Sequence, residues 1–389
     1  VGIVRTDAQL FGGFSFAGGR PQNFPKQALV EELEKQYDVE EIDPTSPIEE
    51  DTYDVMIVVQ PSSLSPEEFD NVVTSIASGQ PTAVFEDPRP VFLANAPATG
   101  EPKMGPGGGM PGMPPGMGGG GQPQPKGDMQ KMWNLLGLDV PGETTMMGQY
   151  APDLAWQEYN PYLKLQVQGI PDSWVFCRPE APGAEEAINE ESPITSGLQE
   201  IFFPVPGTIK PDKDSDLNFS VLVQTGDAAG TISFQDFMDN QSNPARMKDI
   251  QGRPEGKQII AARITGTLED DQSMSDAEYE VAQADTSEPE AADESGDGAS
   301  ADAEDATAAS DDSSADEDEV PEAPKKKKRS IDVVYVADID LMISTFLRIR
   351  AMPGEDEEIG WNFENVDFLL NIVDSLSGDN DYIAIRKQK

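Results

Sequence analysis

Polar and acidic side chains follow four apolar segments of this chain, each at the point where a strand is predicted to end. Paired carboxylates could serve acid–base hydrolysis, and clustered hard oxygens could bind Ca²⁺ or Mg²⁺. A pocket for a polar or cationic group, or an edge that docks another protein, would use the same side chains. The residues that leave these strand ends are Thr6, Asp7, Gln60, Pro61, Ser62, Glu86, Asp87, Asp338 and Asp340.

Ordinary turn chemistry explains the same residues, and we favour it because Asp, Pro and Ser are common where strands give way to turns. A metal site would rest on Glu86, Asp87 and Asp338, whose spacing does not match an EF-hand loop. A hydrolase would need two acids at a separation that only the fold sets. The candidate ligand- or partner-binding residues are Asp7, Gln60, Ser62, Glu86, Asp87, Asp338 and Asp340.

The composition removes several classes of site. The chain contains no histidine and one cysteine, Cys177. Ser-His-Asp catalysis, Cys-His catalysis, and zinc sites made of three histidines or four cysteines are therefore excluded. Cys177 is followed by Arg-Pro-Glu and not by a strand-to-helix elbow, so we expect a buried structural thiol. We expect no catalytic residue, no metal and no cofactor.

The net charge of the chain limits the kinds of partner that it is expected to bind. The net charge is -45 at pH 7, from 27 basic and 72 acidic residues. Nucleic acids and anionic membrane surfaces are polyanions, so neither is an expected partner. No run of 18 or more apolar residues occurs, so no transmembrane helix is expected. Because the chain begins at Val1, we interpret it as a soluble piece of a longer protein whose membrane anchors lie outside this segment.

The first 96 residues alternate in type and form the first part of a predicted α/β domain. "VGIVRT", "YDVMIVVQP" and "PTAVFEDP" read as strands, and "FPKQALVEELEKQYDVEEID" as a helix followed by a strand. In "SPEEFDNVVTSIASG" the order Ser65, Pro66, Glu68 is a helix start signal, and Gly79 is a stop signal. The alternation predicts parallel strands joined by helical crossovers.

Two low-complexity tracts interrupt the domain. Residues 97–127 are rich in Gly, Pro and Met and predict a flexible loop, since they cannot bury enough surface to offset their ordering entropy. Residues 267–330 predict a disordered acidic linker, and 269–322 within it hold 22 acidic residues and no Lys or Arg. The run 325–329, "KKKKR", could be a nuclear import signal, but we interpret it as a gatekeeper before a hydrophobic strand.

Residues 128–266 continue the domain with additional strands, and residues 331–389 close it. "DMQKMWNLLGLDV" predicts a helix, and "SWVFCRP", "EIFFPVPGTIK", "NFSVLVQTG" and "KQIIAARITG" predict strands. The last part reads as a strand in "RSIDVVYVADIDLM", a helix in "ENVDFLLNIVDSLSG" and a closing strand in "YIAIRKQ". Core packing is the expected role of five clustered aromatic residues, with a sugar platform or a partner interface as alternatives. They are Trp133, Trp156, Tyr159, Tyr162 and Trp174.

The order of these segments resembles a known family over nearly all the ordered parts. "ALVEELEKQYDVEEID", "YDVMIVVQPSSLSPEEFDNVVTSIASGQPTAVFEDP", "MWNLLGLDV", "ESPITSGLQEIFFP" and "VVYVADIDLM…NVDFLLNIVDSLSGDNDYIAIRKQ" resemble successive stretches of the extracytoplasmic domain of GldG-type proteins. These are auxiliary components of an ABC-type transport system associated with gliding motility in some bacteria. Departures occur at Gly79-Gln80-Pro81, where the family has Gly-Gly-Lys, and at Ser192, where it has His.

The resemblance implies a fold and a role. The fold would be a doubly wound α/β sandwich with a mostly parallel sheet, similar to the class I glutamine amidotransferase-like fold. The role would be that of a non-enzymatic accessory domain on the extracytoplasmic face of a bacterial membrane. Its partner would be the transporter permease or a related membrane subunit. The alternative is a module that binds an envelope sugar, peptide or polymer at the strand-end rim.

Overall fold

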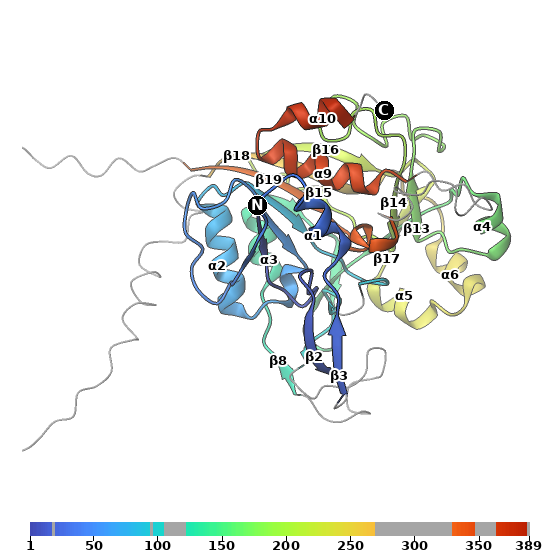
Figure 1. Cartoon of the computed structure of the whole chain (residues 1–389). Helices are drawn as coiled ribbons and strands as arrows, with labels where there is room; N and C mark the ends of the chain where they lie inside the picture. The colour runs from blue at the N-terminus through green and yellow to red at the C-terminus, as the bar shows by residue number, and fades with distance from the viewer. Residues whose placement is uncertain (18–19, 94–95, 105–121, 269–328, 347–362, 387–389) are drawn as a thin grey trace, which may run out of the picture. The chain divides into compact units, whose positions relative to one another are not determined.

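A seven-stranded sheet is the centre of the computed structural model (Figure 1). The structure describes residues 1–17, 20–93, 96–104, 122–268, 329–346 and 363–386. The chain divides into two units, 1–268 with 329–389 and 269–328, and all described residues belong to the first. In spatial order the strands are β16 (Asn218–Gln224), β18 (Ile259–Leu268), β19 (Arg329–Val336), β6 (Thr82–Phe85), β5 (Met56–Val59), β1 (Gly2–Val4) and β4 (Glu40–Ile42).

The sheet is mostly parallel, as the alternation of segments predicts. β19, β6, β5, β1 and β4 pair in parallel, whereas β18 runs antiparallel to both of its neighbours, β19 and β16. The four strands that carry the candidate polar residues, β1, β5, β6 and β19, are consecutive neighbours. Their carboxyl ends therefore meet at one edge of the sheet.

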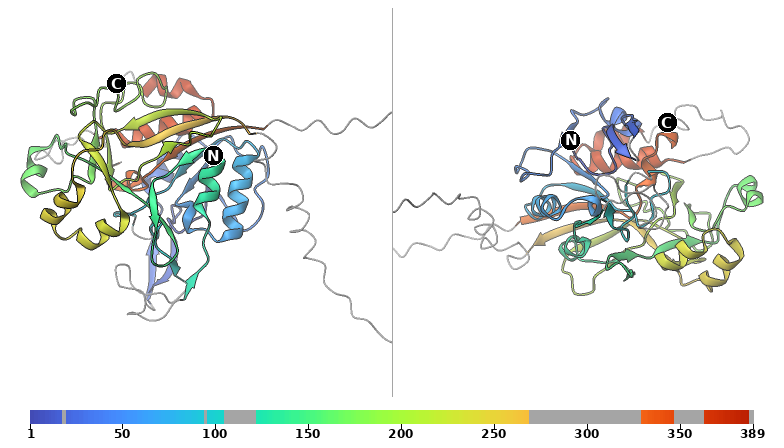
Figure 2. Two further views of the ribbon diagram at one scale, coloured as in Figure 1. Left: turned by 180° about the vertical axis from the view of Figure 1, so that it is seen from behind. Right: turned by 90° about the horizontal axis from the view of Figure 1, so that it is seen from below.

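Two helices cover one face of the sheet (Figure 2). They are α2 (Pro66–Ala77) and α3 (Met129–Leu135). The predicted start of α2 is confirmed: the Ser65 hydroxyl accepts from the backbone N–H of Glu68, and the Glu68 carboxylate accepts from that of Ser65. Such a capping box satisfies two N–H groups that a helix end otherwise leaves unpaired. In α3, Trp133 is buried and donates a 2.9 Å hydrogen bond from its Nε1 to the Tyr335 hydroxyl.

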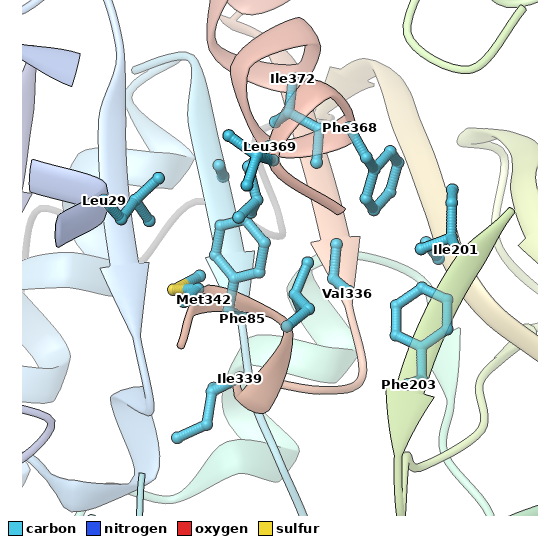
Figure 3. Close-up of a cluster of buried hydrophobic side chains, with 14 of the residues drawn as sticks. Leu29, Phe85, Ile201, Phe203, Val336, Ile339, Met342, Phe368, Leu369 and Ile372 are labelled. Atoms are coloured by element: carbon cyan, nitrogen blue, oxygen red, sulfur yellow. The ribbon is translucent and has the colours of Figure 1, made fainter. Parts of the chain in front are cut away.

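The other face is covered by α1 (Ala28–Leu33) and α9 (Asn365–Leu376). Figure 3 shows Phe368, Leu369 and Ile372 of α9 lying over Phe85 of β6 and Val336 of β19. All five are at most 3% exposed, so this contact is core.

Two asparagines fix α9 to distant segments. Asn365 exchanges two hydrogen bonds with the backbone of Phe202, accepting from N at 3.1 Å and donating to O at 2.7 Å. Asn371 donates to the carbonyl oxygen of Ile194 at 2.9 Å. Both asparagines belong to the closing stretch used above for the family resemblance. Their positions indicate a docking role, because a buried amide that meets backbone groups sets the register of the helix.

One predicted strand is wrong. "YIAIRKQ" lies in and beyond a helix, α10 (Asn380–Arg386). Ile383 is buried, but Tyr382 and Ile385 remain exposed, so the apolar residues do not supply the one-sided burial that a strand needs. Arg386 instead binds α9, pairing with Asp374 and donating to Asn371 Oδ1 at 3.1 Å. A short apolar run has no periodicity that separates helix from strand, and here the polar contacts with α9 favour the helix.

Six two-stranded sheets and three further helices complete the described fold. The helices are α4 (Leu163–Gln168), α5 (Phe234–Asn240) and α6 (Pro244–Gln251), and the one-turn helices are η1 (Pro61–Ser63) and η2 (Asp340–Met342). The strand pairs are β2 (Gly13–Ala17) with β3 (Arg20–Phe24), β7 (Lys103–Met104) with β8 (Pro123–Gln124), β9 (Leu138–Asp139) with β15 (Lys210–Pro211), β10 (Gly142–Thr144) with β11 (Tyr150–Pro152), β12 (Leu154–Gln157) with β17 (Ala229–Ile232), and β13 (Trp174–Cys177) with β14 (Ile201–Pro204).

The strands on either side of the acidic tract are longer than predicted. β18 ends at Leu268 and β19 begins at Arg329, whereas the expected tract was 267–330. Leu268 and Arg329 are direct cross-strand partners, so β18 and β19 form a hairpin around the intervening residues. The predicted linker and the lysine run lie outside the described residues, except at these two ends.

This register predicts that residues 269–328 can be replaced by Asn-Gly, a pair that favours a tight hairpin turn. The free energy of unfolding should stay the same or rise, because closing a short loop costs less entropy than closing a long one. Urea unfolding followed by circular dichroism tests this. Loss of a single cooperative transition in the shortened chain would show that the acidic tract contributes to the fold.

Candidate functional site

The structure brings the predicted strand-end residues together but buries nearly all of them. Asp7 is partly exposed. The other six are at most 1% exposed: Gln60, Ser62, Glu86, Asp87, Asp338 and Asp340. The position of this set at one sheet edge follows from the parallel strand order, whereas its burial was not predicted.

Gln60 is the hub of the buried set. Its backbone has a φ of 55°, a left-handed conformation that turns the chain sharply after β5. Its Nε2 donates to the carbonyl oxygens of Asp87 and Pro97, each at 2.9 Å, and to Glu86 Oε1 at 3.3 Å. Its Oε1 accepts from the backbone N–H of Asp87 at 3.0 Å. One amide thus links the end of β5 to the end of β6 and to the segment that follows.

Glu86 is also fully engaged. Its Oε2 accepts from the backbone N–H of Ser62 at 3.0 Å, and its Oε1 accepts from the Thr99 hydroxyl at 2.5 Å. Burial raises the pKa of Glu86 above its ordinary value, although these donors oppose the shift. Both oxygens of the Glu86 carboxylate are therefore hydrogen-bonded within the protein, and the side chain is shielded from solvent.

Three aspartates form a second buried group beside Glu86. Asp87 accepts from the backbone N–H groups of Arg89 at 2.7 Å and Ile339 at 3.2 Å. Asp338 Oδ1 accepts from the N–H of Leu341 at 2.9 Å, while its Oδ2 has no hydrogen-bond partner among the described residues. Burial raises the pKa of Asp338 well above its ordinary value, and the charge of Asp87 raises it further. Burial and the neighbouring charge therefore both favour the neutral form of Asp338.

Asp340 holds the turn that follows β6. Its Oδ2 accepts from the backbone N–H of Val91 at 2.6 Å, and its Oδ1 accepts from those of Phe92 at 2.9 Å and Leu93 at 2.8 Å. Burial raises the pKa of Asp340 to about 6, against the effect of these three donors. The carboxylate acts as the anchor for three consecutive backbone N–H groups, which otherwise have no partner in regular structure.

The two ends of the Gly/Pro/Met-rich tract cover the strand ends, which differs from the expectation of a flexible loop over 97–127. Thr99 is 3% exposed and joins Glu86. Lys126 donates to the carbonyl oxygens of Thr99 at 2.6 Å and Glu101 at 2.9 Å, and burial lowers its pKa to about 8. Gly127 lies so close to Phe69 that a Cβ would stand 2.3 Å from the ring. Residues 105–121 lie outside the described residues.

These contacts define what the strand ends can do chemically. Their carboxylates and amide are hydrogen-bonded to loop backbone, so they position segments 88–93 and 96–101 above the sheet. No group of three or more acidic or cysteine side chains within the described ranges is arranged to hold a metal ion. The hydrogen bonds join these side chains and the loop backbone into one connected buried network.

Cys177 is fully buried in β13, as expected for a structural thiol. Burial raises the pKa of its thiol, which disfavours the reactive thiolate. The five clustered aromatic residues differ in burial. Trp133 and Trp156 are 1% exposed and Tyr162 is 8% exposed. Tyr159 and Trp174 are half-buried. Core packing therefore accounts for three of the five.

Sequence reasoning missed a buried acid at Glu200. The Tyr162 hydroxyl donates to Glu200 Oε1 at 2.8 Å, and Arg178 Nη1 donates to Glu200 Oε2 at 3.1 Å. Burial raises the pKa of Glu200 to about 7. Glu200 precedes the apolar strand "IFFP", and a lone glutamate there gives no sequence signal of burial. Its partners come from 38 and 22 residues earlier in the chain.

The raised pKa predicts how Glu200 affects stability with pH. Between the ordinary pKa of 4.5 and about 7, the folded state binds a proton that the unfolded state releases. Glu200 therefore stabilises the fold most below pH 4.5, and this contribution is lost as the pH rises towards 7. In the variant Glu200→Gln the free energy of unfolding should not show this decrease with pH. Urea unfolding from pH 4 to 8 measures it. Parallel pH profiles for the two proteins would contradict the assignment.

The comparisons with known proteins identify a family for this chain. The sequence profile of one family, described as an ABC-type uncharacterized transport system, matches residues 1–372. No curated protein and no solved structure matches the chain. No helix in the described part of the chain is long and apolar enough to cross a membrane. Since the match extends over most of the sequence, the chain belongs to this family of auxiliary components of ABC-type transport systems.

Proposed function

We propose that this chain is a non-enzymatic, extracytoplasmic accessory domain of an ABC-type transport complex and that it acts by protein–protein contact. Within the family, the GldG-type proteins associated with gliding motility are the proposed subtype, because the ordered segments resemble theirs in order and spacing. The proposed partner is the permease or a related membrane subunit. The proposed fold family is that of the class I glutamine amidotransferases, with the parallel sheet and helices on both faces as support.

The network at the strand ends is the observation that carries the contact mechanism. In open α/β sheets, ligands usually bind outside the carboxyl ends of the strands. Here the polar side chains at that edge are bound to loop backbone and covered, with Gln60 and Glu86 at most 1% exposed. Such a network holds loops in fixed positions, which favours a surface that meets another protein over a site that transforms a small molecule.

The alternative, a ligand site at the strand-end rim, has less support for the same reason. A hollow of about 270 Å³ lies elsewhere, next to β4. Its lining includes Glu41, Asp43, Glu49 and Tyr53. Asp43 is already paired with Arg5 and Thr45.

Purification of the tagged full-length protein from native membranes tests the proposal. We expect the permease or another membrane component of the ABC transport system to copurify in a fixed ratio. Protease treatment of intact cells after the outer envelope is opened should digest the domain, as expected for the extracytoplasmic face. Recovery of cytoplasmic proteins alone, or protection from the protease, would contradict the proposal.

A further inference from the structure

A small apolar surface stands out next to the buried network. Val91 is 39% exposed and Phe92 is 44% exposed, although both are large apolar residues. The Phe92 ring meets the half-buried Trp174 edge-on, with ring centroids 6.0 Å apart. We call Val91, Phe92 and Trp174 the Phe92 surface. Aromatic side chains of this kind are the usual anchors of protein interfaces.

The backbone beneath this surface is held firmly. Asp340 accepts hydrogen bonds from three consecutive N–H groups, those of Val91, Phe92 and Leu93. Asp87 accepts from the N–H of Arg89 two residues earlier. A turn fixed in this way loses little conformational freedom when a partner binds, so exposed apolar groups on it contribute more to affinity. The buried carboxylates thus present Val91 and Phe92 in a defined position.

The charge at the edge of the surface indicates what kind of segment would cover it. Arg89 forms no ion pair with any described residue, and its Nε is buried without a hydrogen-bond partner. Its Nη1 makes one long bond, 3.4 Å, to the carbonyl oxygen of Pro90. The charge of Arg89 acts on the buried Asp340 carboxylate without forming an ion pair with it, so a carboxylate supplied by a partner would be its direct charged partner. A two-fold contact of the surface with itself would place two Arg89 side chains together and supply no carboxylate.

We propose that the Phe92 surface is the docking site for a peptide segment of another component of the transport system, and that this segment presents an apolar side chain next to a carboxylate. The inference rests on the proposed function and adds the surface and the chemistry of its partner. The apolar side chain would contact Phe92 and Trp174, and the carboxylate would pair with Arg89.

Site-specific photo-crosslinking in the full chain, in native membranes, tests the site. A photoreactive phenylalanine analogue replaces Phe92, and matched control chains carry it at Met146 or Leu163, which are 96% and 75% exposed. We expect a crosslink from position 92 to an apolar residue adjacent to Asp or Glu in another component of the transport system. A crosslink to a second copy of this chain, equal yields at the control positions, or no crosslink at position 92 would overturn the site.

Two substitutions give a second readout. Phe92→Ala should lower the amount of copurified transport component about tenfold, as for a central interface residue, and Arg89→Gln should lower it by a smaller factor, as for a charge at the edge. Met146→Ala should leave it unchanged. Copurification that is unaffected by Phe92→Ala would reject this surface while leaving the proposed function intact. Failure of the wild-type chain to copurify with any transport component would instead reject the proposed function.

Discussion

The variant Asp340→Ala should lower the free energy of unfolding by about 3 kcal/mol, because three N–H groups lose their acceptor. These are the backbone groups of Val91, Phe92 and Leu93, each within 2.9 Å of the Asp340 carboxylate. Relief of repulsion from the neighbouring aspartates offsets part of the loss. Urea unfolding at pH 7.5 measures the difference.

The matched variant Asp340→Asn separates the role of the acceptor from that of the charge. Its side-chain oxygen can still accept from Phe92 and Leu93, whereas the Val91 N–H loses its acceptor, so the variant should cost about 1 kcal/mol, less than Asp340→Ala. Because the pKa of Asp340 is raised to about 6, the wild type should also lose stability relative to Asp340→Asn as the pH rises from about 4 to 6. An Ala variant as stable as the Asn variant would contradict the anchoring role.

The variant Gln60→Glu should lower the free energy of unfolding by about 4 kcal/mol at pH 8, because it puts a second buried carboxylate beside Glu86 and removes a donor. In the wild type, Gln60 Nε2 donates to Glu86 Oε1 and to the carbonyl oxygens of Asp87 and Pro97. The loss should shrink towards pH 5, where protonation of the pair restores a donor. Chemical unfolding at both values measures it.

Gln235→Glu is the control for this substitution, since it makes the same change of charge on an exposed residue of α5. It should change stability by less than about 0.5 kcal/mol. A Gln60→Glu protein that unfolds like the control, or whose stability does not depend on pH, would show that the strand ends are open to water.

The sequence predicted the elements whose signals are local. Ser65, Pro66 and Glu68 predicted the start of α2 because a capping box involves only neighbours in the chain. The apolar runs over β5, β6 and β19 predicted buried strands, and parallel pairing predicted that Gln60, Glu86 and Asp338 lie at one edge, where the structure has them. The predicted strand at "YIAIRKQ" was wrong because its fate depends on contacts with α9 that the local pattern does not contain.

The burial of the site depends on long-range contacts in the same way. Thr99 and Lys126 lie in a tract whose composition predicted a flexible loop, yet they join the network through Glu86 and the backbone of 98–101. Asp340 reaches a turn almost 250 residues earlier in the chain. The polar residues after the strands therefore predicted where the buried network lies. The hydrogen-bond partners that determine the role of these residues come from segments far apart in sequence.

Acids at the strand ends can either bind a ligand or hold the loop backbone in place, and the two roles imply different functions for the same fold. A parallel sheet with acids at its strand ends resembles an enzyme scaffold, but fold alone does not define activity. In this chain the acids stabilise the backbone of 89–93 and 339–341, where Val91 and Phe92 are exposed and Arg89 is partly exposed. The proposed role in contact follows from which groups the network exposes.

Amide hydrogen exchange in the purified full-length chain tests the central claim most directly, because that claim is that the strand-end network is closed. The N–H groups of Ser62, Asp87 and Leu93 donate to buried side chains of the network. We predict that they exchange about a thousand-fold or more slowly than unprotected amides, as the core strands do. The exposed turn around Met146 provides the fast reference. Exchange of the three amides as fast as that turn would contradict the account.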